Sequence, residues 1–185
     1  RESLADDDGA FNAYSLAASV ESVQGTALVG LRFLLDADWV KPEVRRRAAR
    51  VLLPHYKSQN DDWGRLAVLT ACFHLEEDVD ERRAFVQQLT RLLIEEMGVP
   101  EEALELLFEH LAKDPHDAHT RDSVEKLAND LGRQTDLIDA YRPLAAGADS
   151  KAVAVFSSRS AELLLAKQRD DEALQVLERW SVRFP

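Results

Sequence analysis

The chain contains few residues that interrupt helices. It has 185 residues but only 7 glycines and 6 prolines. A protein built from many short strands needs a turn former near most strand ends, so this scarcity argues against a β fold. Apolar residues recur at intervals of three and four, and sustained alternation of apolar and polar residues is absent. We therefore predict an all-α protein.

Cysteine and long apolar runs are nearly absent as well. Cys72 is the only cysteine and lies in the apolar stretch 69–73, so we predict a buried free thiol and no internal disulfide. A free thiol fits a reducing compartment, and we expect a cytoplasmic rather than an exported protein. No apolar run approaches the roughly 20 residues of a membrane span. Because the chain begins at Arg1 and ends at Pro185, we expect it to be a piece of a longer protein.

Basic charge is in the minority. The 23 lysines and arginines stand against 34 aspartates and glutamates, which gives a formal net charge of −11. Binding to the phosphate backbone of nucleic acid requires a concentrated basic face, so we expect no nucleic-acid partner. The one basic cluster, residues 45–50, we interpret as a solvated helix face.

The patterns that would indicate an enzyme are missing. The sequence has no glycine-rich phosphate loop and no Gly-x-Ser-x-Gly elbow. Cys72 and His74 are two residues apart, which on a helix points them to different sides. The tightest candidate for a metal is the segment 114–119, with His116 and His119, but it lacks the fixed spacing of a helical ligand pair. We predict no catalytic residues, no metal and no cofactor.

Short polar breaks divide the chain into helices. Asp61, Asp78, Asp117 and Asp149 are suitable N-caps, Thr26 can cap the second helix, and Pro42 and Pro100 suit first turns. Because the connections are short, successive helices are expected to fold back antiparallel.

An internal repeat is the most informative feature. Residues 80–115 align without a gap on residues 150–185, and most of the identical positions fall on one helical stripe. The identical pairs are Ala84/Ala154, Leu93/Leu163, Glu102/Glu172, Ala103/Ala173, Leu104/Leu174, Leu107/Leu177 and Pro115/Pro185. Extending this frame gives one domain over 1–185, with paired-helix units at about 8–40, 41–78, 79–115, 116–148 and 149–185.

The repeat resembles the tetratricopeptide family. That family has a small residue early in its second helix, a large apolar residue four positions later and a proline at the end of the repeat. Residues 84–115 match with Ala103, Leu107 and Pro115, and with Gly98 in the turn between the helices. Residues 154–185 match with Ala173, Leu177 and Pro185. The other units match less well, and the family's tryptophan in the first helix is absent. The resemblance implies a right-handed superhelical α-α solenoid of about five antiparallel helix pairs.

In this family the first helix of each pair lines a concave groove that binds protein segments. The resemblance therefore implies a non-catalytic scaffold whose groove suits an extended or helical segment with an acidic portion. A carboxylate clamp is not expected, because Pro54 stands where that subfamily has asparagine. The implied groove residues come from three helices and are Arg47, Arg50, Lys57, Phe85, Gln88, Leu92, His119, Asp122, Lys126 and Asn129.

Two other functions compete with the scaffold. The chain could be a helical regulatory or spacer domain of a larger enzyme or transcription regulator, with its contacts made inside the parent protein. An enzyme would instead need a cleft with titratable groups of perturbed pKa. Self-association stays open, and the sequence does not name the partner.

Overall fold

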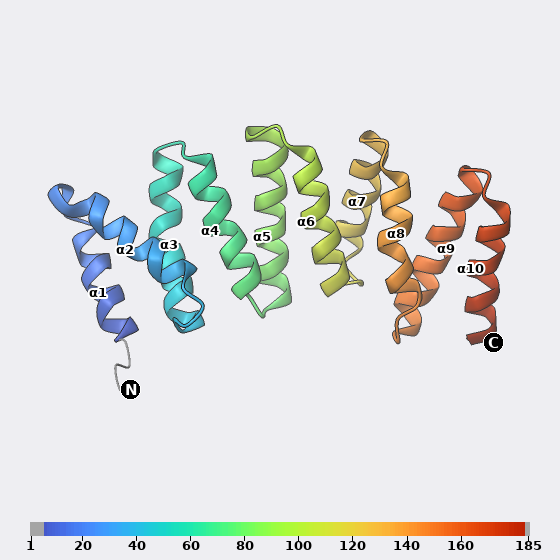
Figure 1. The fold of residues 1–185 in the computed structure, drawn as a ribbon, viewed down its shortest axis with the longest axis horizontal. Helices are drawn as coiled ribbons and strands as arrows, with labels where there is room; N and C mark the ends of the chain where they lie inside the picture. Colours follow the sequence, from blue (N-terminus) through green and yellow to red (C-terminus); the bar gives the residue numbers. More distant parts are fainter. Residues whose placement is uncertain (1–5, 184–185) are drawn as a thin grey trace. The chain divides into compact units, whose positions relative to one another are not determined.

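A computed structural model describes residues 6–183, and these residues form ten α-helices and no strand (Figure 1). The prediction of an all-α protein is therefore confirmed. The helices are α1 (Asp7–Ala17), α2 (Gln24–Asp36), α3 (Pro42–Ser58), α4 (Asp62–Leu75), α5 (Val79–Arg91), α6 (Pro100–Lys113), α7 (Ala118–Asp130), α8 (Gln134–Ala145), α9 (Ser150–Ala166) and α10 (Asp170–Arg183). A 3₁₀ turn, η1 (Glu21–Val23), precedes α2, and a π turn, η2 (Leu92–Glu96), extends α5. None of the described helices combines the length and the apolarity needed to cross a membrane.

The helix starts follow the capping residues closely. Asp61, Asp78, Asp117 and Asp149 each accept backbone N–H bonds at the start of the next helix, as predicted. Thr26 is not a cap, because α2 already begins at Gln24 after the 3₁₀ turn. Side-chain oxygens at these positions satisfy N–H groups that have no partner within the helix.

The chain divides into two compact units, residues 1–98 and residues 99–185. The first contains α1 to α5 with η2, and the second contains α6 to α10. The boundary follows Gly98, which lies between η2 and α6 and has a φ of 67°. This boundary falls inside the helix pair expected at 79–115.

In the first unit, helices fold back on their neighbours around one apolar core. Leu31, Leu35, Ala48, Leu52 and Val68 are fully buried there. Neighbouring helices approach each other closely at two glycines. The ring of Tyr14 in α1 lies against Gly30 in α2, and the ring of Tyr56 in α3 lies against Gly64 in α4. A Cβ atom at either glycine would stand 2.5 Å from the tyrosine ring, so neither position has room for a side chain.

The second unit packs α6 against α7 and α8, and α9 against α8 and α10. Ala103 in α6 and Ala173 in α10 are both buried, as the repeat alignment predicts. Their aligned neighbours differ, since Leu104 is buried whereas Leu174 is 56% exposed. The difference arises because α6 packs against two helices of the unit and α10 packs mainly against α9. The alignment partner of Pro115, Pro185, lies outside the described residues.

Candidate functional site

The first unit contains a cavity of about 300 Å³ between α3, α4 and α5. Its apolar lining consists of Ala49 and Leu53 from α3, Cys72 from α4 and Phe85 from α5. Phe85 is half-buried and packs against the apolar core of the unit, so its ring is held in place while one face stays accessible. The cavity is of a size that takes one or two side chains of a bound segment.

Charged side chains of both signs surround this apolar lining. Arg46 and Arg50 stand on the α3 side, whereas Glu76 and Glu81 stand on the α4 and α5 side. Glu76 is already engaged, because its carboxylate accepts the backbone N–H groups of residues 77 and 78 at 3.0 and 3.2 Å. Arg50 is exposed and makes no ion pair within residues 6–183. An acidic ligand group would therefore find its free counter-charge on the α3 side.

The thiol of Cys72 faces the same cavity in a protonated state. Burial raises its pKa to about 11, and the nearby carboxylate of Glu76 adds to this effect, while Arg50 opposes it. Because the thiolate is the nucleophilic form, a thiol with so high a pKa is unreactive at neutral pH. Cys72 therefore serves here as an apolar lining residue, and the predicted buried free thiol is confirmed.

The structure brings only part of the expected first-unit groove together. Arg50 and Phe85 both line the cavity, and Lys57 and Gln88 are exposed but do not. Leu92 was expected on the groove and is 1% exposed. This expectation is wrong because Leu92 continues the buried stripe of Val86 and Leu89 at a spacing of three residues.

Arg47 also differs from its expected role. Its guanidinium lies 2.6 Å from Asp8, donates to Asn12 at 3.0 Å and stacks 4.1 Å above the ring of Phe11. These contacts tie α3 to α1 and leave the side chain 39% exposed. Arg47 therefore already makes its contacts within its own chain. Its position on the helix does not reveal these contacts.

Two further arginines of the basic cluster have structural roles. Arg45 donates to the carbonyl of Leu35 at 2.8 Å, near the end of α2. Arg46 donates to the carbonyl of Leu75 at 3.0 Å, at the end of α4. Both satisfy carbonyl groups that have no partner at a helix C-terminus. The interpretation of residues 45–50 as a solvated face is thus wrong for Arg45, Arg46 and Arg47.

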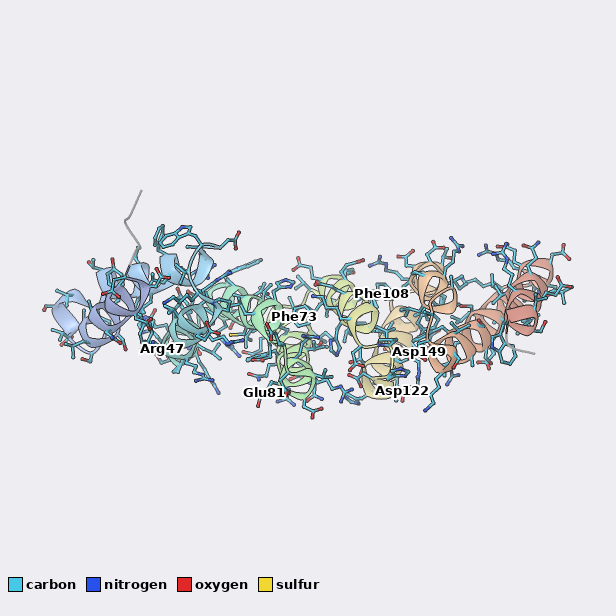
Figure 2. The ribbon with its side chains drawn as sticks, turned by 90° about the horizontal axis from the view of Figure 1, so that it is seen from below. Arg47, Phe73, Glu81, Phe108, Asp122 and Asp149 are labelled. Atoms are coloured by element: carbon cyan, nitrogen blue, oxygen red, sulfur yellow. The ribbon has the colours of Figure 1, made fainter. Side chains whose placement is uncertain are left out.

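The remaining groove candidates lie on α7 in the second unit. His119, Asp122, Lys126 and Asn129 are all exposed, and Figure 2 labels Asp122. Asn129 accepts a hydrogen bond from Gln134 at 3.0 Å, and Asp122 lies 3.9 Å from Arg121. These residues form a polar helix face.

A cluster of His110, Asp114 and Asp117 joins the end of α6 to the start of α7. All three are buried, and their ligand-type atoms lie within 4.8 Å of one another. The sequence had pointed to the segment 114–119 with His116 and His119, which contains Asp114 and Asp117 but not His110. His110 lies in α6 before that segment, and its position one turn before Asp114 was a usable signal.

The contacts of Asp117 favour a capping role for this cluster over metal binding. Its Oδ1 accepts the N–H groups of His119 and Thr120 at 3.0 and 3.2 Å. Its Oδ2 accepts the Thr120 hydroxyl at 2.7 Å and lies 3.3 Å from Nε2 of His110. A carboxylate offers about four lone-pair directions, and these partners use all of them. A metal would have to displace part of the α7 cap.

Comparison of the chain with protein-family models, with curated proteins and with solved structures found no match.

Proposed function

We propose that this chain is a tetratricopeptide-like α-α solenoid that acts as a non-catalytic protein-interaction scaffold. The observation that carries the proposal is the cavity between α3, α4 and α5, in which an accessible aromatic ring lies beside an unpaired arginine. The repeat of 80–115 in 150–185 supports the solenoid, because paired helices of this kind bury their apolar faces by stacking.

The proposed ligand is a protein segment that places an apolar side chain on Phe85 and an acidic side chain beside Arg50. The apolar contact would supply most of the binding energy, since a few desolvated anchors usually dominate an interface. The charge contact would set the direction of the segment, because Arg46 and Arg50 lie on one side and Glu81 on the other.

This proposal is tested by selecting peptides from a library on the immobilised chain. The binding kinetics of the enriched peptides are then measured. We expect peptides that combine an acidic residue with an apolar one. Arg50→Glu should slow association at low salt and lose its effect at high salt, because exposed charges are screened within roughly 10 Å. Phe85→Ala should speed dissociation at any salt, by a factor that corresponds to about 1–3 kcal/mol.

Two variants serve as controls. Arg91→Glu changes the same charge on an arginine of α5 that is 73% exposed and does not line the cavity. Gln88→Ala truncates an exposed neighbour of Phe85 outside the cavity. Equal effects of the controls and the cavity variants would mean that binding does not use this cavity. No enriched peptide at all would count against the scaffold.

A further inference from the structure

A second cavity lies in the second unit and is independent of the proposed peptide site. It occupies about 400 Å³, which is within the size range of small-molecule sites. Its walls come from α8 and α10, both of which pack on α9, and its floor comes from α9. The floor residues Val153, Ser157, Ser160 and Leu164 follow one stripe of α9 and are all at least nine-tenths buried.

The floor contains a polar group that lacks a partner. Ser160 is 3% exposed, and its hydroxyl forms no hydrogen bond although the oxygen is buried. Ser157, one turn earlier, is 2% exposed and lines the same cavity. A buried hydroxyl without a partner is uncommon and calls for a specific explanation, such as a bound group that supplies the missing bond.

The mouth of the cavity contains one arginine without an ion-pair partner. Arg179 is exposed and makes no ion pair among the described residues, whereas Arg142 lies 3.0 Å from the exposed Asp139 and helps to lower the pKa of Glu172. The one acidic lining residue, Glu172, is neutralised by Arg169, which donates to both carboxylate oxygens at 2.7 Å. On a chain of net charge −11, this mouth favours an anion.

Apolar and aromatic side chains line the same cavity beside the arginines and the hydroxyl groups. They include Ile138 of α8 and Val176 and Trp180 of α10. Trp180 is 36% exposed, so one part of its ring remains open to a ligand. The cavity thus combines exposed cationic, apolar and buried hydroxyl groups.

We propose that this cavity binds a small aromatic carboxylic acid that has a second hydrogen-bonding group at its far end. The carboxylate would pair with Arg179 and Arg142, the ring would lie against Trp180 and Val176, and the far group would bond the Ser160 hydroxyl. Charge complementarity selects an acid over an amine, and the buried hydroxyl selects a polar over an apolar far end.

Binding of three related probes tests the assignment. The probes are 4-hydroxyphenylacetate, phenylacetate and tyramine, which differ in the far hydroxyl and in the sign of the charge. The readout is titration calorimetry together with the fluorescence of Trp180 in a chain that carries Trp39→Phe and Trp63→Phe. These two tryptophans are 60% and 68% exposed and lie in the first unit, so the substitutions spare the cavity. We expect 4-hydroxyphenylacetate to bind about three- to tenfold more tightly than phenylacetate, and tyramine not to bind.

Two variants assign the contacts. Ser160→Ala should abolish the preference for the hydroxylated probe without loss of stability, whereas Ser158→Ala, on the exposed side of α9, should leave the preference intact. Arg179→Gln should weaken both acids about tenfold, and Lys167→Gln, an exposed cation outside the cavity, should not.

Several outcomes would overturn the proposal. It fails if neither acid binds at millimolar concentration, if tyramine binds as well as the acids, or if Ser160→Ala and Arg179→Gln both bind like the parent chain. A peptide with a C-terminal tyrosine offers the same carboxylate and phenol. Binding of that peptide far more tightly than 4-hydroxyphenylacetate would identify a protein partner and refute the small-molecule assignment.

Discussion

At the scale of single residues, two tyrosine–glycine contacts set how closely the helices of the first unit approach. Gly30→Ala would place a Cβ atom 2.5 Å from the ring of Tyr14, so the ring or the helix must move. We expect a loss of about 1–3 kcal/mol in the free energy of unfolding, the usual cost of overpacking. Gly25→Ala in the same helix meets no atom within 4 Å and should be neutral or stabilising. Denaturant melts of both variants check this, and equal stabilities would refute the contact.

Two buried acids make the protein sensitive to alkaline pH. Burial raises the pKa of Cys72 from 9.0 to about 11. The Tyr141 hydroxyl donates a hydrogen bond of 3.0 Å to the carboxylate of Glu125. Burial and this carboxylate raise the pKa of Tyr141 above its ordinary value of 10.0. Above these ordinary values the unfolded chain releases protons that the folded chain keeps. The free energy of unfolding should therefore fall as the pH rises from about 9, and stay flat with respect to these groups below it.

Substitutions separate the two contributions. Cys72→Ala should remove the part of the decline that lies between pH 9.0 and about 11. Tyr141→Phe should flatten the decline above pH 10.0, although it also loses the hydrogen bond to Glu125 and starts from a lower stability. Melting curves recorded across this range provide the measurement. An unchanged slope in both variants would mean that neither group titrates differently on folding.

For single residues, the sequence predicted which side chains are buried better than it predicted which exposed side chains are free to bind a partner. Cys72, Ala103 and Ala173 are buried as expected, because apolar periodicity reports which side of a helix faces the core. Arg47 looked available because periodicity does not say what lies opposite an exposed position. Its partners Asp8, Asn12 and Phe11 are distant in sequence and are brought to it by folding.

At the scale of helices, Ala173 and Leu174 give a matched pair of tests on α10. Ala173 is buried in a cluster with Ile138, Ala161 and Leu164, whereas Leu174 is 56% exposed. Ala173→Leu should cost about 1–3 kcal/mol through overpacking. Leu174→Ala should change the free energy of unfolding by about 0.5 kcal/mol or less. Chemical denaturation measures both, and the reverse order would show that the assigned face of α10 is wrong.

Helix starts were predictable and helix interiors less so. Aspartates at caps and prolines in first turns act locally, so Asp78, Asp117, Pro42 and Pro100 could be assigned from sequence alone. No short sequence pattern comparable to a capping aspartate predicts the π turn at the end of α5. Leu92, where this turn begins, was expected on the groove and is buried.

At the scale of the whole molecule, the division into two units was not visible in the repeat pattern. The pattern joins residues 80–115 into one helix pair, whereas the compact units end and begin at Gly98 and Val99. A repeat alignment compares sequences, but compactness depends on which faces are buried together. The candidate site was likewise only half predicted, because Arg50 and Phe85 were expected and the α4 wall with Cys72 was not.

The two-unit division predicts how fragments behave. Residues 99–185, produced alone, should be helical and unfold cooperatively, since α6 to α10 form a compact unit of their own. Residues 1–98 should do the same around the core of Leu31, Leu52 and Val68. Circular dichroism and calorimetric melts of the two fragments provide the check. A fragment without a cooperative transition would show that its unit needs the rest of the chain.

The π turn also bears on how such repeats change during evolution. Between the two repeat copies it coincides with no gap, because α5 with η2 covers residues 79–96, α9 covers 150–166, and the two segments end at aligned positions. A π turn accommodates an extra residue inside a helix, because its hydrogen bonds span five positions instead of four. An insertion or deletion can therefore be absorbed within a helix while the loops at both ends keep their length. Any comparison of this chain with a distant homologue should consequently allow a one-residue gap within Leu92–Glu96, where gaps are normally penalised.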